Sequence, residues 1–194
     1  TQRSYGADVL SRIQSANEGH EKELQAAVTK DLREGVVQLC GDLVTQKAIK
    51  HIVISGNTTM CHLLRGYSCK TLGAAPFTPR HLELEQWKEE DIAITIFPGA
   101  SAFIGGDIVS GIYAINDETE PWMLLDFGTN GEMVLWTGEQ LIATAAAAGP
   151  AFEGGNITCG CASVPGAISS VMIAGCHSHT KTIGGIPAIG ICGS

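Results

Sequence analysis

The sequence has no excess of basic residues and no cluster of them. Its 194 residues include 12 Lys and Arg against 20 Asp and Glu, a formal net charge of −8, and the basic side chains are scattered. A protein that binds nucleic acid usually presents a basic field over one face. We therefore expect no nucleic-acid partner.

Uninterrupted apolar runs of membrane length are also missing. The most apolar window, residues 92–115, is about long enough to cross a bilayer, but it contains Pro98 and Asp107. A central Asp costs about 2.5–3.5 kcal/mol on insertion scales. The window instead predicts a strand over Ile92–Phe97 followed by a helix over Ala100–Ile115, and no membrane partner.

The seven cysteines do not suggest a disulfide framework, because their number is odd and their spacing irregular. This usage favours a reduced, cytoplasmic compartment. Cys159, Cys161 and Cys176 lie near His177 and His179, but the spacing matches no common zinc pattern. We expect buried free thiols here rather than a metal site.

The first part of the chain reads as helices and one β-turn-α unit. Apolar residues recur with helical spacing over residues 5–16 and 24–43. The apolar run 51–54 predicts a strand buried on both faces. Asn57 predicts the cap of a following helix over 58–64.

Residues 71–90 mix glycine, proline and acidic side chains, which predicts a surface connection. Its acidic end, 83–91, is expected to be a solvated face, with a partner-binding patch as the alternative. His51, His62 and His81 stand alone and give no indication of a site.

The pattern of apolar residues changes near residue 119, from helical spacing to short runs separated by turns. Trp122–Asp126, Glu132–Trp136 and Gln140–Ala146 predict three strands joined by short turns, a β-meander. We place a boundary between two structural units near residue 119.

The turn between the first two of these strands contains more than a hairpin requires. Asn130-Gly131 alone would suffice to bend the chain, yet Asp126 and Gly128-Thr129 precede it. Glycines let backbone N–H groups approach a phosphate, and a carboxylate at a strand end can hold Mg²⁺ through the waters of the ion. The alternative is an ordinary Asn-Gly hairpin with a turn-capping Asp.

Other nucleotide-binding signatures are missing. The sequence has no Walker A motif, and no G-x-G-x-x-G follows a strand. Asp107, a charge among apolar residues, is a further candidate for function. A helix cap or a hydrogen bond between lobes is the plainer interpretation.

Several segments, taken together and in order, resemble the reductive activators of corrinoid proteins, a family of ferredoxin-linked ATPases. These segments are YGADVLSRI (5–13), SGNTTMCHLL (55–64), APFTP (75–79), LLDFGTNGE (124–132), AAGPAFEGGNITCG (147–160) and GICGS (190–194).

The resemblance implies an α/β, ribonuclease H-like fold of the actin, Hsp70 and acetate-kinase superfamily, with two lobes. Residues 1–119 would be the remainder of an incomplete first lobe, and 120–194 the start of the second. ATP and Mg²⁺ would bind between the lobes, and hydrolysis would drive an electron onto the cobalt of a corrinoid protein. The family's iron–sulfur cluster is expected only in a region absent from this chain. We expect the chain itself to be a piece of a longer ATPase, with little or no activity alone.

The same resemblance assigns roles to particular residues. Asp126 would orient Mg²⁺ or its waters, Glu132 would orient the loop, and Glu153 would order the attacking water. For Glu153, a carboxylate that complements a helix dipole is an equal alternative. The remaining candidates would line the phosphates or the nucleotide: Gly128, Thr129, Asn130, Gly131, Gly149, Gly154, Gly155 and Gly193.

Two other functions stay open at this point. A small-molecule kinase of the same superfamily would need a base for its acceptor, and a non-catalytic module would only dock a corrinoid protein. A homodimer is one assembly that the sequence leaves open.

Overall fold

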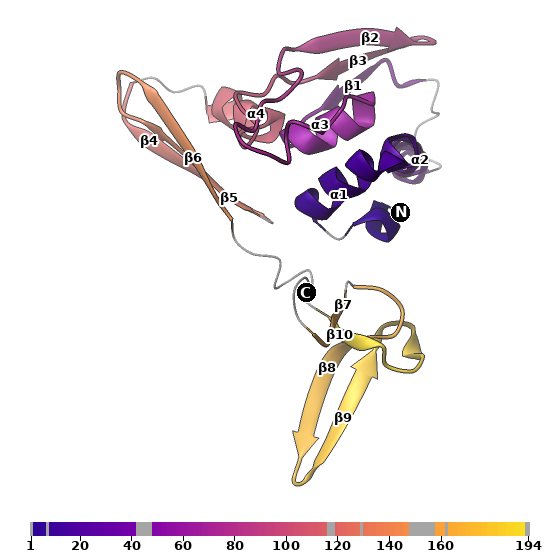
Figure 1. Cartoon of the computed structure of the whole chain (residues 1–194). Coiled ribbons are helices and arrows are strands. Elements are labelled where there is room, and N and C mark those ends of the chain that lie inside the picture. Colours follow the sequence, from indigo (N-terminus) through magenta and orange to yellow (C-terminus); the bar gives the residue numbers. More distant parts are fainter. Residues whose placement is uncertain are drawn as a thin grey trace.

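The computed structural model describes residues 2–6, 8–41, 48–115, 119–128, 130–147, 158–161 and 163–192. Within these residues it contains a group of N-terminal helices and three separate sheets (Figure 1).

Helices form the N-terminal part. They are η1 (Gln2–Tyr5), α1 (Val9–Ser15), η2 (Ala16–His20) and α2 (Glu21–Cys40). The Asp8 side chain accepts a hydrogen bond from the Ser11 N–H at 2.8 Å and begins α1. The two helical predictions are confirmed over α1 and α2, although Leu10 and Leu39 of the predicted apolar faces are 70% and 86% exposed, and residues 42–43 of the second prediction lie outside the described residues.

The first sheet has the strand order β1-β3-β2, built from β1 (His51–Ile54), β2 (Glu85–Glu89) and β3 (Ile92–Ile96). β3 runs parallel to β1 and antiparallel to β2. The predicted strand at 51–54 is confirmed, but its expected burial on both faces is wrong, because Val53 is 61% exposed. β2 lies within the stretch that we predicted to be only a surface connection.

Helix α3 (Thr58–Arg65) follows β1 as predicted, and the Asn57 side chain caps it by accepting from the Met60 N–H at 2.8 Å. α3 packs against α2, and Figure 1 shows it beside the first sheet. The core here contains Ile13, Ala16, Leu24, Leu63, Cys69 and Leu72. Leu72 therefore shows that the connection after α3 also contributes to the core.

Helix α4 spans Gly106–Ile115. Our prediction started this helix at Ala100, but residues 100–104 form a bend closed by the Ala100 N–H, which donates to the Ile104 carbonyl at 2.8 Å. Ile104 and Ile108 pack with Val134 in a second core. This core joins α4 to the second sheet.

The second sheet is the predicted β-meander, with β4 (Trp122–Phe127), β5 (Asn130–Trp136) and β6 (Leu141–Ala147) in the order β4-β5-β6. Both strand pairs are antiparallel. Alternate residues of β4 differ in burial, as expected for a sheet with one packed face: Trp122 and Leu124 face the second core, whereas Met123 and Leu125 are exposed.

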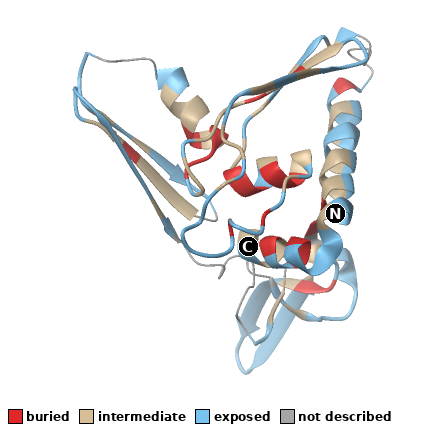
Figure 2. Ribbon diagram, turned by 45° about the horizontal axis from the view of Figure 1, so that its top comes forward, coloured by how far each residue is buried: buried red, intermediate tan, exposed pale blue. Residues whose placement is uncertain are grey.

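The third sheet has the order β7-β10-β8-β9, from β7 (Gly160–Cys161), β8 (Ala167–Ala174), β9 (His177–Thr182) and β10 (Gly190–Cys192), with the short helix η4 (Ile183–Gly185) before β10. Figure 2 shows that most of its described residues are exposed. Among the described helices of the whole chain, none is both long enough and apolar enough to span a bilayer.

Candidate functional site

The site is built where two strand-to-helix turns touch. β1 and β3 are parallel, so the turns that follow them lie at the same edge of the sheet. The N–H of Gly106 donates to the Gly56 carbonyl at 2.9 Å, and the Ser55 hydroxyl donates to the Gly106 carbonyl at 2.7 Å. These bonds fix the start of α4 against the start of α3.

The sequence Gly105-Gly106 permits this approach. A Cβ atom on Gly105 would lie 2.6 Å from the Asn57 Cα, and one on Gly106 would lie 2.9 Å from the Phe97 carbonyl oxygen. Both distances are too short for a side chain, so only glycine fits. The following residue, Asp107, is consequently held in one place at the beginning of α4.

Asp107 is half-buried, and its Oδ1 accepts the N–H of Ile108 at 2.9 Å. The cap interpretation is therefore confirmed in part. Burial raises the pKa of Asp107 above its ordinary value, against the effect of the Ile108 hydrogen bond, and the charge of Asp126 raises it further. The carboxylate of α4 thus lies within electrostatic reach of β4.

Asp126 and Glu132 are paired in register across β4 and β5. Burial raises the pKa of Glu132, and the charges of Asp107 and then Asp126 add to the effect. Three carboxylates from three elements therefore lie close enough to repel one another. Asp126 itself is exposed and accessible to a ligand.

The glycine turn beside these acids is open. The Gly128 N–H donates to the Asn130 carbonyl at 2.9 Å, which closes the turn. A Cβ atom added to Gly131 would meet nothing within 4 Å. Internal packing therefore does not require glycine at 131, and space for a ligand remains beside the backbone.

The structure brings together the predicted residues Asp126, Gly128, Asn130, Gly131 and Glu132 on one hairpin. The other predicted residues lie outside the described part of the chain, and their roles stay predictions: Thr129, Gly149, Glu153, Gly154, Gly155 and Gly193.

No group of three His, Cys, Asp or Glu side chains is placed to hold a metal ion by itself among the residues that the structure describes. Cys161 is partly buried, but Cys159 and Cys176 are exposed, so our expectation of buried thiols is wrong for these two. The three carboxylates likewise do not form a complete set of metal ligands on their own.

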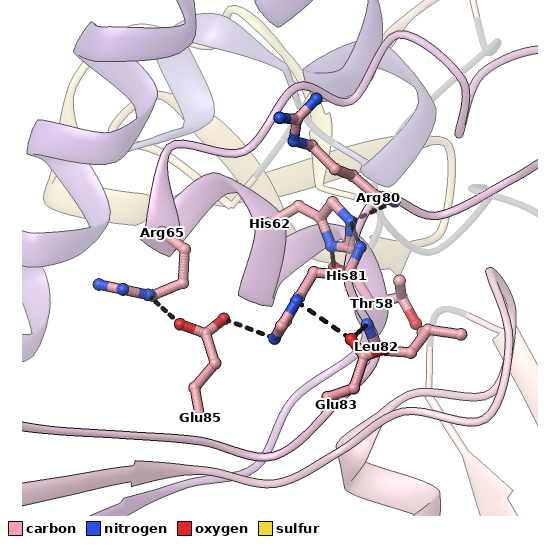
Figure 3. Close-up of polar contacts among 8 residues, drawn as sticks. All are labelled: Thr58, His62, Arg65, Arg80, His81, Leu82, Glu83 and Glu85. Atoms are coloured by element: carbon pink, nitrogen blue, oxygen red, sulfur yellow. Dashed lines mark hydrogen bonds and ion pairs between the residues drawn. The ribbon is translucent and has the colours of Figure 1, made fainter.

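A second polar cluster, which the sequence patterns did not reveal, is built from His62 and His81 (Figure 3). His62 is only 2% exposed, and His81 lies between Glu83 and Glu85, at 3.1 and 3.3 Å. Glu85 also pairs with Arg65 at 2.7 Å. The only signal in the sequence was the i, i+4 spacing of Thr58 and His62 on α3.

The interpretation of residues 83–91 as a solvated acidic face is confirmed for Glu83, Glu89, Glu90 and Asp91, which are exposed, but it is wrong for Glu85. The Glu85 side chain is 14% exposed and connects β2 to α3. The Arg65 guanidinium in turn lies 4.4 Å from the centre of the Trp87 ring.

Two family models match the chain. The model of the RACo middle region matches residues 1–118, and the model of the C-terminal ASKHA domain of RACo matches residues 120–194.

Two curated proteins are similar to the chain. The corrinoid activation enzyme RamQ of Eubacterium limosum is 31% identical over 207 residues, covering 100% of the chain and 34% of the relative. The [Co(II) methylated amine-specific corrinoid protein] reductase of Methanosarcina barkeri is 48% identical over 54 residues, covering 28% of the chain and 10% of that protein.

A solved structure is similar as well. It is a reductive activator for corrinoid, iron–sulfur protein, with a TM-score of 0.73, 36% identity, and coverage of 99% of this chain and 33% of its own. The chain thus spans about a third of the length of the relatives that match it throughout.

Proposed function

Because this chain belongs to the RACo family of corrinoid activators, we propose that it forms part of an ATP-binding and ATP-hydrolysing unit that drives reductive activation of a corrinoid protein. The observation that carries the proposal is the convergence of Asp107, Asp126 and Glu132 beside the open turn of Gly128 and Gly131.

The donor set fits Mg²⁺. Hard carboxylate oxygens suit this ion, which usually keeps several waters and takes one or two carboxylates plus the phosphates of its substrate. Burial and mutual repulsion raise the pKa values of Asp107 and Glu132, so a bound cation would relieve an existing electrostatic cost.

Each part of the hairpin has a separate task in this proposal. Asp126, exposed at the end of β4, would hold the waters of the ion, and Mg²⁺ would neutralise phosphate charge. The open turn at Gly128 and Gly131 would leave room for the β- and γ-phosphates to approach the backbone. Glu132 would orient the turn, and Asp107, fixed by Gly105-Gly106, would orient a water or a ligand of the ion from the α4 side.

Positioning and charge stabilisation supply most of the catalysis of phosphoryl transfer. A rigid Asp107 on a helix, opposite an Asp126 on a strand, is the kind of support that such positioning requires. The proposal includes two further roles that rest on the family resemblance alone. Glu153 would order the attacking water, and the nucleotide would be bound by Gly149, Gly154, Gly155 and Gly193.

The partner in this proposal is a corrinoid protein, since the matched relatives are named for acting on corrinoid proteins. The net charge of −8 argues against nucleic acid as a partner. We place the protein in the cytoplasm on its cysteine usage.

The test is MgATP hydrolysis by the complete protein that carries these residues. We expect Asp126→Asn to lower turnover by about a hundredfold or more, because a positioned carboxylate is lost, while circular dichroism shows an intact fold. Glu139→Gln, in the exposed turn before β6, is the matched control and should retain wild-type turnover. Wild-type turnover in Asp126→Asn would reject the proposed site.

A further inference from the structure

His62 is buried in α3 with both ring nitrogens engaged (Figure 3). Nδ1 lies 2.8 Å from the Thr58 carbonyl oxygen of the preceding helical turn. Nε2 lies 3.1 Å from the backbone N of Arg80 and 3.4 Å from that of His81. The ring therefore connects its own helix to a segment that lies 18 residues further along the chain.

These partners determine the tautomer of His62. A carbonyl oxygen can only accept, so Nδ1 must carry a proton, and a backbone N–H can only donate, so Nε2 must present its lone pair. The neutral ring with the proton on Nδ1 satisfies every contact. A second proton, on Nε2, would point at two N–H groups and would break both bonds.

The surroundings of His62 also disfavour the second proton. Burial lowers the pKa of His62, and the neighbouring His81 lowers it further, while the Thr58 carbonyl and the charge of Glu85 oppose the shift. The other ionisable groups nearby are Glu83, Arg65, Arg80, Tyr67 and Cys61. The Cys61 thiol stays neutral, because burial raises its pKa to about 11.

The segment between α3 and β2, residues 66–84, is here called the strap. Its first half is anchored by the buried side chains of Cys69 and Leu72. Its second half is attached to α3 through the two N–H bonds to His62. Beyond them, the Leu82 carbonyl accepts the Gly99 N–H at 2.8 Å.

The strap therefore continues into the turn that leads to Asp107. The Leu82 side chain packs so closely on Gly99 that an added Cβ atom would lie 3.0 Å from it. The Thr58 hydroxyl donates to the Ser101 carbonyl at 2.7 Å. Both partners of this turn depend on His62. The Thr58 carbonyl is bonded to the His62 ring, and Leu82 directly follows His81, whose N–H is bonded to the same ring.

We propose that His62 is a pH-sensitive pin, which fastens the strap to α3 and thereby fixes the 99–105 turn while its ring is neutral, and which releases both when the ring is protonated. The proposal concerns the conformation of this chain and does not depend on ATP hydrolysis, so each proposal can fail without the other.

Amide hydrogen exchange between about pH 8 and about pH 5, the range in which histidine titrates, tests the pin in the 194-residue chain. After correction for intrinsic exchange, protection of the Arg80, His81 and Gly99 amides should fall about tenfold or more relative to the β3 amides as the pH falls. Constant relative protection over this range would overturn the proposal.

Two variants distinguish which of the two histidines causes the pH dependence of amide protection. His62→Gln keeps an acceptor for the strap but cannot titrate, so protection at Arg80 and His81 should no longer depend on pH. His81→Gln should retain a pH dependence, with its midpoint moved to higher pH because His81 lowers the pKa of His62. If instead His81→Gln abolishes the dependence, His62 is not the pin.

The tautomer gives an independent measurement on the wild-type chain, which holds even if a variant fails to fold. Long-range ¹H–¹⁵N correlation spectra should show His62 protonated on Nδ1 alone at about pH 8. The ring should become doubly protonated only at a pH below the ordinary histidine pKa of about 6.5. A proton on Nε2 at the higher pH would overturn the proposal.

Discussion

Asp126 and Glu132 lie directly opposite each other on the antiparallel strands β4 and β5. Their side chains therefore project from the same face of the hairpin, and like charges at such positions destabilise a sheet. Asp107 adds a third negative charge from α4, and the proposed Mg²⁺ would relieve this repulsion.

Replacing one member of the pair should stabilise the ligand-free chain. We expect Glu132→Gln to increase the free energy of unfolding by about 0.2–1 kcal/mol, because a like-charge cross-strand pair is removed. The melting temperature should rise by about 0.4–4 °C. Differential scanning calorimetry at low salt measures the shift.

The control for this measurement is Glu139→Gln, which removes one charge from an exposed turn. It should change the melting temperature by less than Glu132→Gln does. Equal shifts in the two variants would assign the effect to net charge instead of to the pair.

Mg²⁺ should stabilise the wild-type chain more than a monovalent salt of equal ionic strength. Binding to the folded state alone adds RT ln(1 + [L]/Kd), so an excess of tenfold over Kd would add about 1.4 kcal/mol. We expect the Mg²⁺-dependent increase in melting temperature to be reduced in Asp126→Asn and in Asp107→Asn. The same increase in wild type and in both variants would show that the ion binds elsewhere.

The pH dependence of stability follows from the raised pKa values of Asp107 and Glu132. Between the ordinary pKa and the raised one, the folded chain binds more protons than the unfolded chain, so this contribution to stability falls as the pH rises. The double variant Asp107→Asn, Glu132→Gln should therefore gain stability relative to wild type as the pH increases from about 3 to about 7.

Chemical denaturation at several pH values measures this difference. Working with the difference between variant and wild type removes the contribution of His62. That contribution has the opposite sign, because a lowered pKa makes stability fall as the pH decreases below about 6.5. A difference that stays constant with pH would contradict the assigned electrostatic coupling.

Local patterns were sufficient to predict much of the fold. The meander, the strand at 51–54 and the helix capped by Asn57 each depend on periodicity and turn residues within one segment, and all three are confirmed. The α/β fold class of the actin, Hsp70 and acetate-kinase superfamily is confirmed by the ASKHA match and by the similar solved structure.

The features that were missed depend on contacts between distant segments. α4 begins at Gly106 and not at Ala100, because the preceding turn is bonded to Leu82 and Thr58. The environment of His62 comes from residues 80 and 81, which periodicity cannot bring to α3. In the same way, Asp126 was identified from its own turn, but its electrostatic coupling to Asp107 depends on how α4 packs against β4.

The contact between the two turns gives a final prediction, on Gly105. A Cβ atom there would lie 2.6 Å from the Asn57 Cα and 2.7 Å from the Thr58 N, and backbone atoms cannot move aside as a flexible side chain can. Gly105→Ala should therefore lower the free energy of unfolding by about 1–3 kcal/mol, as overpacking does.

Gly35 provides the matched control, because it lies within α2 and an added Cβ would meet nothing within 4 Å. Gly35→Ala should raise the free energy of unfolding by about 0.5–1 kcal/mol through the better helix propensity of alanine. Urea denaturation of both variants measures the two effects, which should have opposite signs. If Gly105→Ala were instead as stable as wild type, the turns after β1 and β3 could not be in contact, and Asp107 would not be held beside the hairpin.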